Sequence, residues 1–193
     1  LEAVSEVLKP DVSLHLLGVT RAEAMDDFAR LGVTSFDSTS PLRQAFMDDR
    51  NNYHTDLGAY TAIRVPQVEG NPRLKRRILS GEVDQSSAVR LERASLQALW
   101  AFDNGDVSAD ETLTVVCEYE ALVDPTKASY VKHYQKLLAD QPWKACPCNL
   151  CQSHGIDIVI VRGSERNKRR GFHNVSVLGR KVPGRPKILG EVV

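Results

Sequence analysis

The first 45 residues show the hydrophobic pattern of a β-α-β unit. The short run at 13–19 is mostly apolar, as is typical of a strand that is buried on both faces. Residues 22–31 have an amphipathic spacing that predicts a helix, and 33–36 predicts a second strand that runs into the turn residues 37–41. Two short parallel strands joined by a helix indicate an α/β architecture, either a doubly wound sheet or a (β/α) barrel.

The middle of the chain changes to a helical pattern. Residues 47–64 are polar and rich in turn formers, and a strand is predicted at 60–65. Amphipathic helices with capping residues follow, at 73–80, from 84 or 86 to 103, after the Ser108–Glu111 capping box, and at 124–139. We therefore expect a mainly helical insertion over residues 47–140.

The last part of the chain combines clustered cysteines, one more predicted strand and a basic segment. The β-branched run at 156–161 predicts the strand. Residues 179–193 contain two prolines and three glycines, which predicts a loosely ordered tail. The expected divisions are thus a β-α-β part at 1–46, the helical insertion, a cysteine-containing segment with the final strand at 141–178, and the tail.

The composition is that of an ordinary folded protein, with 42% hydrophobic and 26% charged residues in a chain of 193. No apolar run approaches the roughly 20 residues that a membrane span needs. Residues 1–4 contain neither an initiator Met nor the charged-then-apolar order of a signal peptide. We therefore expect a cytoplasmic protein without a membrane partner, which can be a fragment of a longer one.

The charges are unevenly distributed, although the formal net charge is zero. Nine Lys and Arg residues and a single acidic residue, Glu165, lie between positions 162 and 187. Arg side chains suit bidentate contacts with phosphates, so a nucleic-acid partner is favoured over the alternative of a solvated charged loop. The expected contacts are Arg162, Arg166, Lys168, Arg169 and Arg170, with further basic residues at Arg43 and at 73–77.

The strongest local signal is a cluster of three cysteines within six residues, Cys146, Cys148 and Cys151. Zn²⁺ prefers four Cys or His ligands in a tetrahedron, and thiolates on one tight loop converge on it at little ordering cost. The fourth ligand is either His154 or His173, and spacing alone does not decide between them. The alternatives are a redox pair or merely buried thiols. Four protein ligands would close the site, so the zinc would be structural.

Asp37 follows a predicted strand directly. Strand ends converge on the pocket in α/β folds, and a carboxylate there can act as a nucleophile or a base. The alternative is that Asp37 caps the turn at 38–41 through local hydrogen bonds. Gly18, at the end of the preceding strand, either lets a flat ligand approach the backbone or serves an ordinary turn.

Taken in chain order, these motifs resemble the C-terminal part of the tRNA-guanine transglycosylase superfamily. The matching segments are the strand end 16–19, Phe36-Asp37 followed by Pro41 and Arg43, and the C-x-C-x2-C cysteines with a later histidine. In that superfamily these motifs lie on the last strands of a zinc-containing (β/α)8 barrel. The resemblance therefore implies the C-terminal portion of a TIM-like barrel with a helical insertion and a zinc-binding subdomain.

The resemblance also implies roles for individual residues. Asp37 falls on the nucleophile, which attacks the ribose anomeric carbon, expels guanine and holds the nucleic acid covalently until a deazaguanine base replaces it. Leu17 and Gly18 fall on base-pocket positions, and Arg43 on an arginine that contacts the backbone. The resemblance favours His173 as the fourth zinc ligand.

The chain departs from the tRNA-acting enzymes in two respects. Asp37 is followed by Ser38-Thr39 where the tRNA enzymes typically have Cys-Val, and more than a hundred residues separate it from Cys146. The large insertion and the Arg-Arg-Gly-Phe-His-Asn run around His173 resemble the transglycosylases of DNA-modification systems, which are thought to install a 7-deazaguanine such as preQ0. Partner proteins of such a system are candidate partners.

The earlier barrel strands, which carry the other catalytic aspartate in the superfamily, have no counterpart in this chain. We therefore expect the chain alone to be inactive. A duplex substrate would also require the target base to leave the stack. The basic residues of the helix at 73–80 are then candidates for holding the DNA backbone. The alternatives are a tRNA-acting transglycosylase, a non-catalytic zinc-stabilised nucleic-acid-binding module, and a small α/β metalloenzyme with an open zinc.

Overall fold

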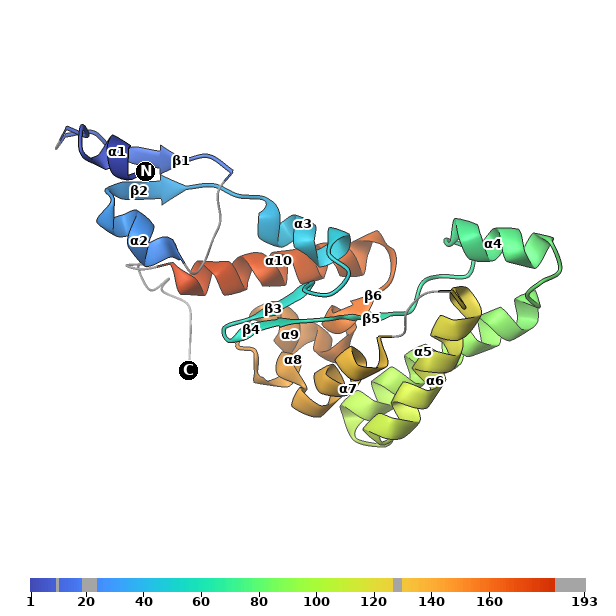
Figure 1. The fold of residues 1–193 in the computed structure, drawn as a ribbon. Coiled ribbons are helices and arrows are strands. Elements are labelled where there is room, and N and C mark those ends of the chain that lie inside the picture. The colour runs from blue at the N-terminus through green and yellow to red at the C-terminus, as the bar shows by residue number, and fades with distance from the viewer. Residues whose placement is uncertain (10, 19–23, 127–129, 183–193) are drawn as a thin grey trace.

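The protein is described here as a computed structural model that covers residues 1–9, 11–18, 24–126 and 130–182. The N-terminal β-α-β unit lies at one end of the molecule (Figure 1). It follows a short helix, α1 (Glu2–Ser5), and its elements are β1 (Leu14–Leu16), α2 (Met25–Arg30) and β2 (Val33–Phe36). β1 and β2 pair in parallel, which confirms the predicted arrangement. The predicted start of the helix at residues 22–23 lies outside the described residues.

The N-terminal unit buries little of its own apolar surface. None of the side chains of β1 or β2 is buried, and Leu17 beyond β1 is 76% exposed. A parallel pair with a connecting helix is a repeating unit of (β/α) barrels. The described residues contain this single unit and a helical remainder, and a barrel is not seen among them.

The region after β2 differs from the predicted polar loop. It contains a helix and a hairpin, made of α3 (Ser40–Met47), β3 (Tyr53–Thr55) and β4 (Gly58–Tyr60). The strand predicted at 60–65 is present but shorter, as β5 (Ile63–Arg64), because Tyr60 instead ends β4. β5 instead pairs in parallel with β6 (Ile160–Val161), which comes from the far end of the sequence.

The predicted helices of the middle region are confirmed, with one exception. They are α4 (Pro72–Leu79), α5 (Gln85–Asn104), α6 (Ala109–Val123) and α7 (Val131–Asp140). Asn71 caps α4, Asp84 caps α5, and the Ser108–Glu111 capping box opens α6. The helix predicted at 124–139 is present as α7, but its predicted start is wrong, because Asp124 is the C-cap of α6 and α7 begins at Val131.

The main hydrophobic core lies under the middle helices and extends into the cysteine segment. Its largest fully buried side chains include Leu99, Tyr119, Tyr134, Trp143 and Ile158. These residues come from both sides of position 140. The insertion and the cysteine segment therefore share one core, and none of the described residues before Tyr53 contributes a side chain to it.

The final strand is shorter than predicted. The short helices α8 (Pro142–Ala145) and α9 (Asn149–His154) lead into a 3₁₀ helix, η2 (Gly155–Val159), which occupies most of the run predicted as a strand. A short β-branched run can be buried in either conformation, so its periodicity does not distinguish them. Here the backbone N–H of Ile156 donates to the Asp103 carboxylate (2.9 Å), which holds the turn against α5.

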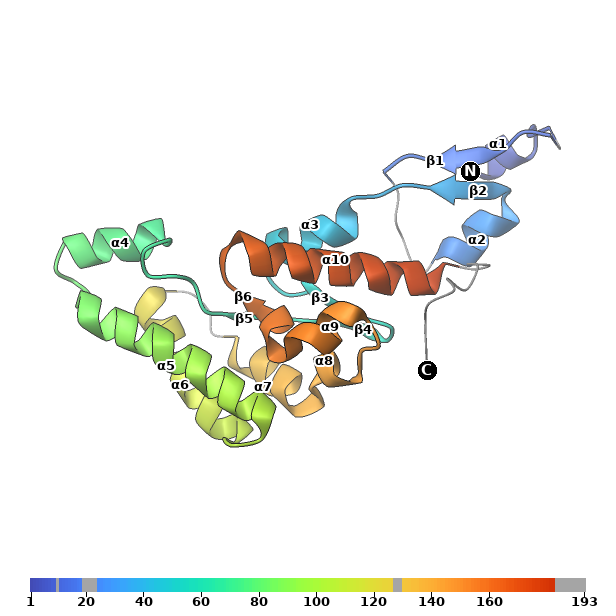
Figure 2. The ribbon, with the colours of Figure 1, turned by 180° about the vertical axis from the view of Figure 1, so that it is seen from behind.

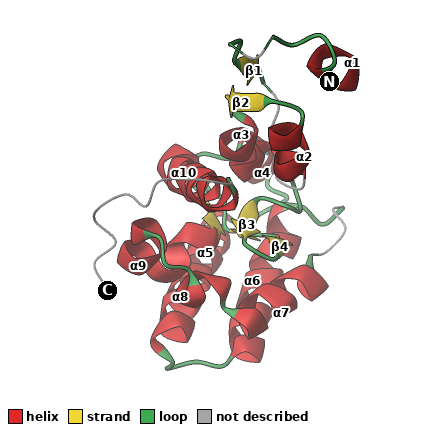
Figure 3. Ribbon diagram, turned by 90° about the vertical axis from the view of Figure 1, so that its left-hand side faces the viewer, coloured by secondary structure: helices red, strands yellow, loops and turns green. Residues whose placement is uncertain are grey.

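The last helix, α10 (Gly163–Lys181), covers the basic stretch, for which no helix was predicted, and extends into the predicted tail. Figures 1 and 2 show that α10 lies along α3, with the β3–β4 hairpin beside them. Figure 3 shows this pair of helices between the β1–β2 unit and helices α5 to α9. Residues 183–193 of the predicted tail lie outside the described part. No described helix has the length and apolar character needed to cross a membrane.

Candidate metal centre and strand-end carboxylate

Four predicted ligands converge on one point in the structure. The sulfur atoms of Cys146, Cys148 and Cys151 and a nitrogen of His173 all lie within 4.8 Å of one another. His173 Nδ1 is 3.8 Å from Cys146 Sγ and 3.3 Å from each of the other two sulfurs. Tetrahedral zinc with ordinary Zn–S and Zn–N bonds would separate these atoms by about 3.6 Å. The donor set therefore fits a metal ion of this size.

The alternative fourth ligand, His154, is not part of the cluster. Its Nδ1 lies 3.5 Å from a terminal nitrogen of Arg169, on the partly buried side of α10. His173 thus takes the fourth position among the described residues, as the family resemblance implied.

The short helices α8 and α9 place the three sulfurs. Cys146 ends α8, and Cys148 is the N-cap of α9, where its sulfur accepts a hydrogen bond from the backbone N–H of Cys151 (3.4 Å). The side chain of Gln152 closes the loop by donating to the Cys146 carbonyl (2.8 Å). The C-x-C-x2-C spacing therefore presents all three thiols to the same side.

The orientation of His173 is set by the β3–β4 hairpin. Its Nε2 lies 2.8 Å from the His54 carbonyl, which can only accept, so Nε2 carries the hydrogen and Nδ1 offers its lone pair to the cluster. The imidazole also stacks on the Tyr53 ring, with centroids 4.2 Å apart and 4° between the planes. The Tyr53 hydroxyl lies 3.3 Å from Cys151 Sγ, where it can donate to a thiolate.

The close packing of the three thiols moves their pKa values in different directions. Hydrogen bonds with Cys148 and Cys151 lower the pKa of Cys146, whereas hydrogen bonds with Cys146 and Cys148 raise the pKa of Cys151. Burial lowers the pKa of His173, but the Cys146 and Cys148 sulfurs outweigh burial and raise it to about 9. Burial, followed by the negative charge on Cys151, raises the pKa of Tyr53. A buried group that concentrates negative charge in this way suits a cation.

Asp37 lies at the carboxyl end of β2, beside the end of β1. Its backbone N–H donates to the Leu16 carbonyl (3.1 Å), and its Oδ1 accepts from the backbone N–H of Gly18 (2.7 Å). Gly18 has a φ of +67°, a backbone conformation that disfavours side chains. The predicted strand-end residues Leu17, Gly18 and Asp37 therefore lie together.

The local turn after Asp37 has a different cap. The backbone N–H of Ser40 donates to Ser38 Oγ (3.1 Å), so Ser38 supplies the local hydrogen bond of the turn. The Asp37 carboxylate is exposed and binds across to the neighbouring strand. These contacts weaken the alternative in which Asp37 only caps its own turn.

The basic residues predicted to contact nucleic acid are mostly engaged within the protein. Arg162 forms an ion pair with Glu92 in which both side chains are 13% exposed. Arg166 pairs with Asp157 (3.0 Å), and Arg169 pairs with Glu165 one turn earlier on α10. The structure thus gives these arginines structural contacts, whatever further role they have.

Arg170 is the clearest difference from the sequence-based expectation. It is fully buried, and its guanidinium donates to the carbonyls of Ala45 (2.6 Å) and Ile160 (3.1 Å). Burial, with a smaller effect of the Arg64 charge, lowers the pKa of Arg170 to about 10. In this position Arg170 ties α10 to α3 and is out of reach of a phosphate. Lys168 on α10 and Arg43 on α3 remain exposed.

The sequence did not indicate the buried residue Asn174, which joins the metal cluster to α3. Its side chain accepts from the His54 backbone N–H (2.9 Å) and donates to the carbonyls of Pro41 and Asn52 (3.1 Å each). Gly171, one turn earlier on α10, lies so close to α3 that an added Cβ would be 2.6 Å from Leu42 Cδ1. The helix that carries His173 is therefore clamped to the helix that begins just after Asp37.

Comparison with known proteins supports the family resemblance. No protein-family model matches the chain. The chain is 51% identical over 181 residues to a protein of Salmonella montevideo named DNA-guanine transglycosylase. The matched region is 92% of this chain and 44% of that protein, so the chain spans less than half the length of this relative. The relationship to the guanine transglycosylases predicted from the sequence is thereby confirmed.

Proposed function

The chain is a relative of a DNA-guanine transglycosylase, and we propose that it forms part of an enzyme that replaces guanine in DNA with a 7-deazaguanine base such as preQ0. The observation that carries this proposal is the exposed carboxylate of Asp37, oriented at a strand end by the Gly18 N–H (2.7 Å). The name of the relative supports DNA as the substrate.

In the proposed reaction, Asp37 is the nucleophile. One carboxylate oxygen is held by Gly18, and the other attacks C1′ of the target deoxyribose. The bond between C1′ and the guanine nitrogen breaks, the electron pair leaves with guanine, and the base takes up one proton. The incoming deazaguanine gives up one proton as its ring nitrogen bonds to C1′ and releases the Asp37 carboxylate. The exchange therefore consumes no net proton and no oxidant.

The target base must be outside the helical stack for this attack, because C1′ and the recognition edge are inaccessible within a duplex. Leu17 and Gly18 are the proposed base-pocket residues on this chain. Leu17 is 76% exposed at the strand end, and Gly18 presents bare backbone there, as contact with a flat base requires. Arg43 and Lys168 are the exposed cations proposed to contact phosphates near the site.

Zinc is the metal proposed for the buried cluster of Cys146, Cys148, Cys151 and His173. When bound, it would supply structural cross-linking, because four protein ligands leave no open coordination position. The residues around it already hold the ligands in place, since His54 orients His173 and Tyr53 stacks on it. We propose that the remaining catalytic groups lie elsewhere in the enzyme, so that the chain alone is inactive.

The decisive experiment replaces Asp37 with Asn in the complete protein. Incorporation of a labelled 7-deazaguanine into DNA should fall by at least about a thousandfold, as expected for loss of a nucleophile, while DNA binding is retained. Asp106→Asn, at an exposed position in the turn after α5, is the matched control and should leave incorporation unchanged. Unchanged incorporation in the Asp37 variant would reject the proposed mechanism and favour a non-catalytic zinc-stabilised nucleic-acid-binding module.

The same assay with tRNA in place of DNA distinguishes the two branches of the superfamily. The proposal expects label in DNA only. Incorporation into tRNA alone would assign the chain to a tRNA-guanine transglycosylase and would overturn the proposed substrate.

A further inference from the structure

The solvent side of α5 carries a continuous row of polar and cationic side chains. At the spacing of successive helical turns, six exposed residues follow one another, and we call them the α5 stripe: Ser86, Arg90, Arg93, Gln97, Trp100 and Asn104. A helix rises 1.5 Å per residue, so the stripe is about 27 Å long. It contains no carboxylate, which is unusual for so long an exposed helix face in a chain with 25 acidic residues.

Two carboxylates near the stripe are turned inward, whereas Asp84, the N-cap of α5, is exposed at the start of the stripe and accepts a hydrogen bond from Ser86 Oγ. Glu92 pairs with Arg162 and accepts from the backbone N–H of Val68 (2.7 Å). Asp103 accepts from the Trp143 indole (2.7 Å) and from a backbone N–H of η2. As a result, every exposed charged side chain within helices α4 and α5 is basic: Arg73, Lys75, Arg76, Arg90 and Arg93.

The adjacent helix α6 has the opposite character. Its exposed charged side chains are the acidic residues Asp110, Glu111 and Glu118. A polyanion would therefore be attracted to the α4–α5 side of the insertion and repelled from the α6 side.

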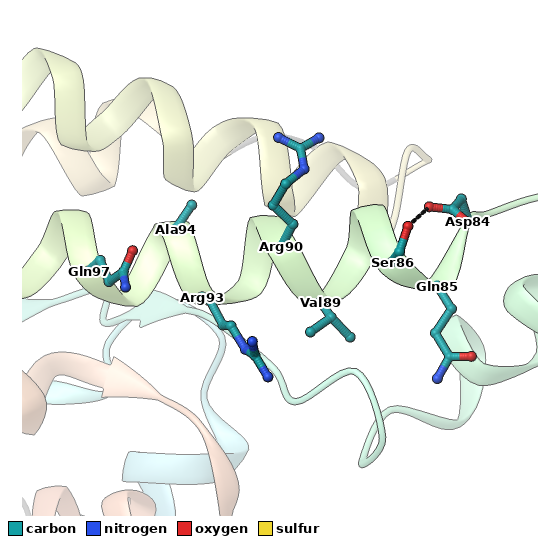
Figure 4. A pocket seen from close by; sticks show the side chains of 8 residues that line it. All are labelled: Asp84, Gln85, Ser86, Val89, Arg90, Arg93, Ala94 and Gln97. Atoms are coloured by element: carbon teal, nitrogen blue, oxygen red, sulfur yellow. Dashed lines mark hydrogen bonds between the residues drawn. The ribbon is translucent and has the colours of Figure 1, made fainter.

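The shape of the stripe also suits an extended ligand. Figure 4 shows Arg90 and Arg93 extending to opposite edges of α5, with Ala94 on the side of Arg90 and Val89 on the side of Arg93. These side chains line a shallow open hollow along the first half of the helix. The hollow is lined by these two cations along its length and by one carboxylate, Asp84, at its end, and two spaced cations suit an extended phosphate backbone better than a compact anion.

The far end of the stripe leads towards α10. The indole N–H of Trp100 donates to Asp157 Oδ1 (3.0 Å), and the same oxygen pairs with Arg166 (3.0 Å). Trp100, which is 42% exposed, thus connects the stripe with the basic N-terminal half of α10, where Lys168 is exposed.

We propose that the α5 stripe, aided by the exposed cations of α4, binds the phosphate backbone of duplex DNA away from the site of base exchange. The proposal rests on the proposed function, because it assumes that the substrate is DNA. Arg and Lys supply the charge contacts, and Ser, Gln and Asn are the neutral side chains that commonly donate to phosphates. Such contacts position the duplex and carry no sequence information.

The structure changes which basic residues of the insertion are expected to contribute. Arg77 of α4 was a candidate from the sequence, but its side chain donates to the carbonyls of Leu122 (2.6 Å) and Val123 (3.3 Å) at the end of α6. It also pairs with Glu82. Arg77 therefore joins two helices, and its replacement would test packing and not DNA binding.

The test is the double variant Arg90→Gln/Arg93→Gln in the complete protein, because Gln removes the charge and keeps a helix propensity close to that of Arg. Binding of a labelled duplex is measured across a series of salt concentrations. Loss of two phosphate contacts should reduce the slope of log K against log salt by about 1.8. The same relation predicts an affinity loss of roughly 60-fold at 0.1 M salt and roughly 9-fold at 0.3 M.

Two further variants make the result specific. Lys132→Gln/Lys136→Gln removes the same two charges from α7 and should leave the salt slope unchanged. Arg90→Lys/Arg93→Lys keeps both charges on α5 and should retain most of the slope. An unchanged slope in the Gln variant, or an equal loss in the α7 control, would overturn the proposal. A loss confined to tRNA would also overturn it, because the ligand would then be RNA.

Base exchange separates this proposal from the proposed function. The Arg90/Arg93 variant should raise the KM for DNA and leave kcat unchanged, because the stripe lies outside the reacting groups. The Asp37→Asn variant should do the reverse, with exchange lost and the salt slope retained. If base exchange survives in the Asp37→Asn variant, the proposed nucleophile is wrong. The salt series with the Arg90/Arg93 variant still tests DNA binding by the α5 stripe independently.

Discussion

Replacement of Asn174 with Ala should destabilise the protein through the clamp between α10, α3 and the β3–β4 hairpin. The variant removes an acceptor from the backbone N–H of His54 and a donor from the carbonyls of Pro41 and Asn52. A donor left unsatisfied in a buried place costs about 1–3 kcal/mol, and each lost hydrogen bond about 1 kcal/mol. We therefore expect the free energy of unfolding to fall by about 3 kcal/mol.

The measurement is a urea titration of the chain, followed by circular dichroism. With a slope of about 2 kcal/mol per molar urea, the loss corresponds to a midpoint that is about 1.5 M lower. Asn51→Ala, at an exposed position in the turn before the hairpin, is the control and should change the free energy by less than about 0.5 kcal/mol. If both variants unfold at the same urea concentration, the hydrogen bonds of Asn174 do not clamp the helices.

Three other changes test separate parts of the structure. Gly171→Ala should lower the free energy of unfolding by about 1–3 kcal/mol, because the added Cβ would be 2.6 Å from a side-chain carbon of α3. A thermal unfolding curve identical to that of the wild type would contradict this packing. Arg162→Ala should lower the free energy of unfolding by about 3 kcal/mol, because it leaves the nearly buried carboxylate of Glu92 unpaired. The control Lys168→Ala, at an exposed position, should lower it by less than about 0.5 kcal/mol. Equal losses would refute the ion pair as a stabilising contact. His173→Ala should lower the zinc content of the purified chain below roughly one equivalent, as measured by elemental analysis. The control His154→Ala should leave the zinc content unchanged. An unchanged zinc content in the His173 variant would show that His173 is not a ligand.

The cysteine motif could be predicted from sequence because its spacing is local. C-x-C-x2-C brings three sulfurs together within two short helices, and no distant contact is needed to place them. The choice of His173 over His154 depended on the family resemblance, because it requires α10 to return to the cluster across the hairpin. The parallel pair of β1 and β2 was likewise predicted from local periodicity and a short connection.

The roles of the basic residues could not be predicted, because they depend on tertiary partners. Arg162, Arg166 and Arg170 look alike in a charged run, yet one pairs with α5, one with η2, and one is fully buried against α3. The run at 156–161 was misassigned for a related reason. Its apolar side chains are buried by contacts with α8, α9 and α10, and those contacts favour a 3₁₀ turn over an extended strand.

The position of Asp37 depends on the remainder of the chain more than on its own strands. β1 and β2 bury no side chain among the described residues, so these strands alone offer little packing energy to fix the carboxylate. Asp37 is instead supported by the segment that follows it. The hydrophobic core packs against the hairpin, and the hairpin orients His173 on α10. α10 in turn packs on α3, which begins at Ser40, just after Asp37. A metal in the cysteine cluster would strengthen this connection at its midpoint. If Asp37 is the proposed nucleophile, loss of a metal from the cluster should impair base exchange by displacing Asp37, although the four proposed ligands would leave that metal without a catalytic role.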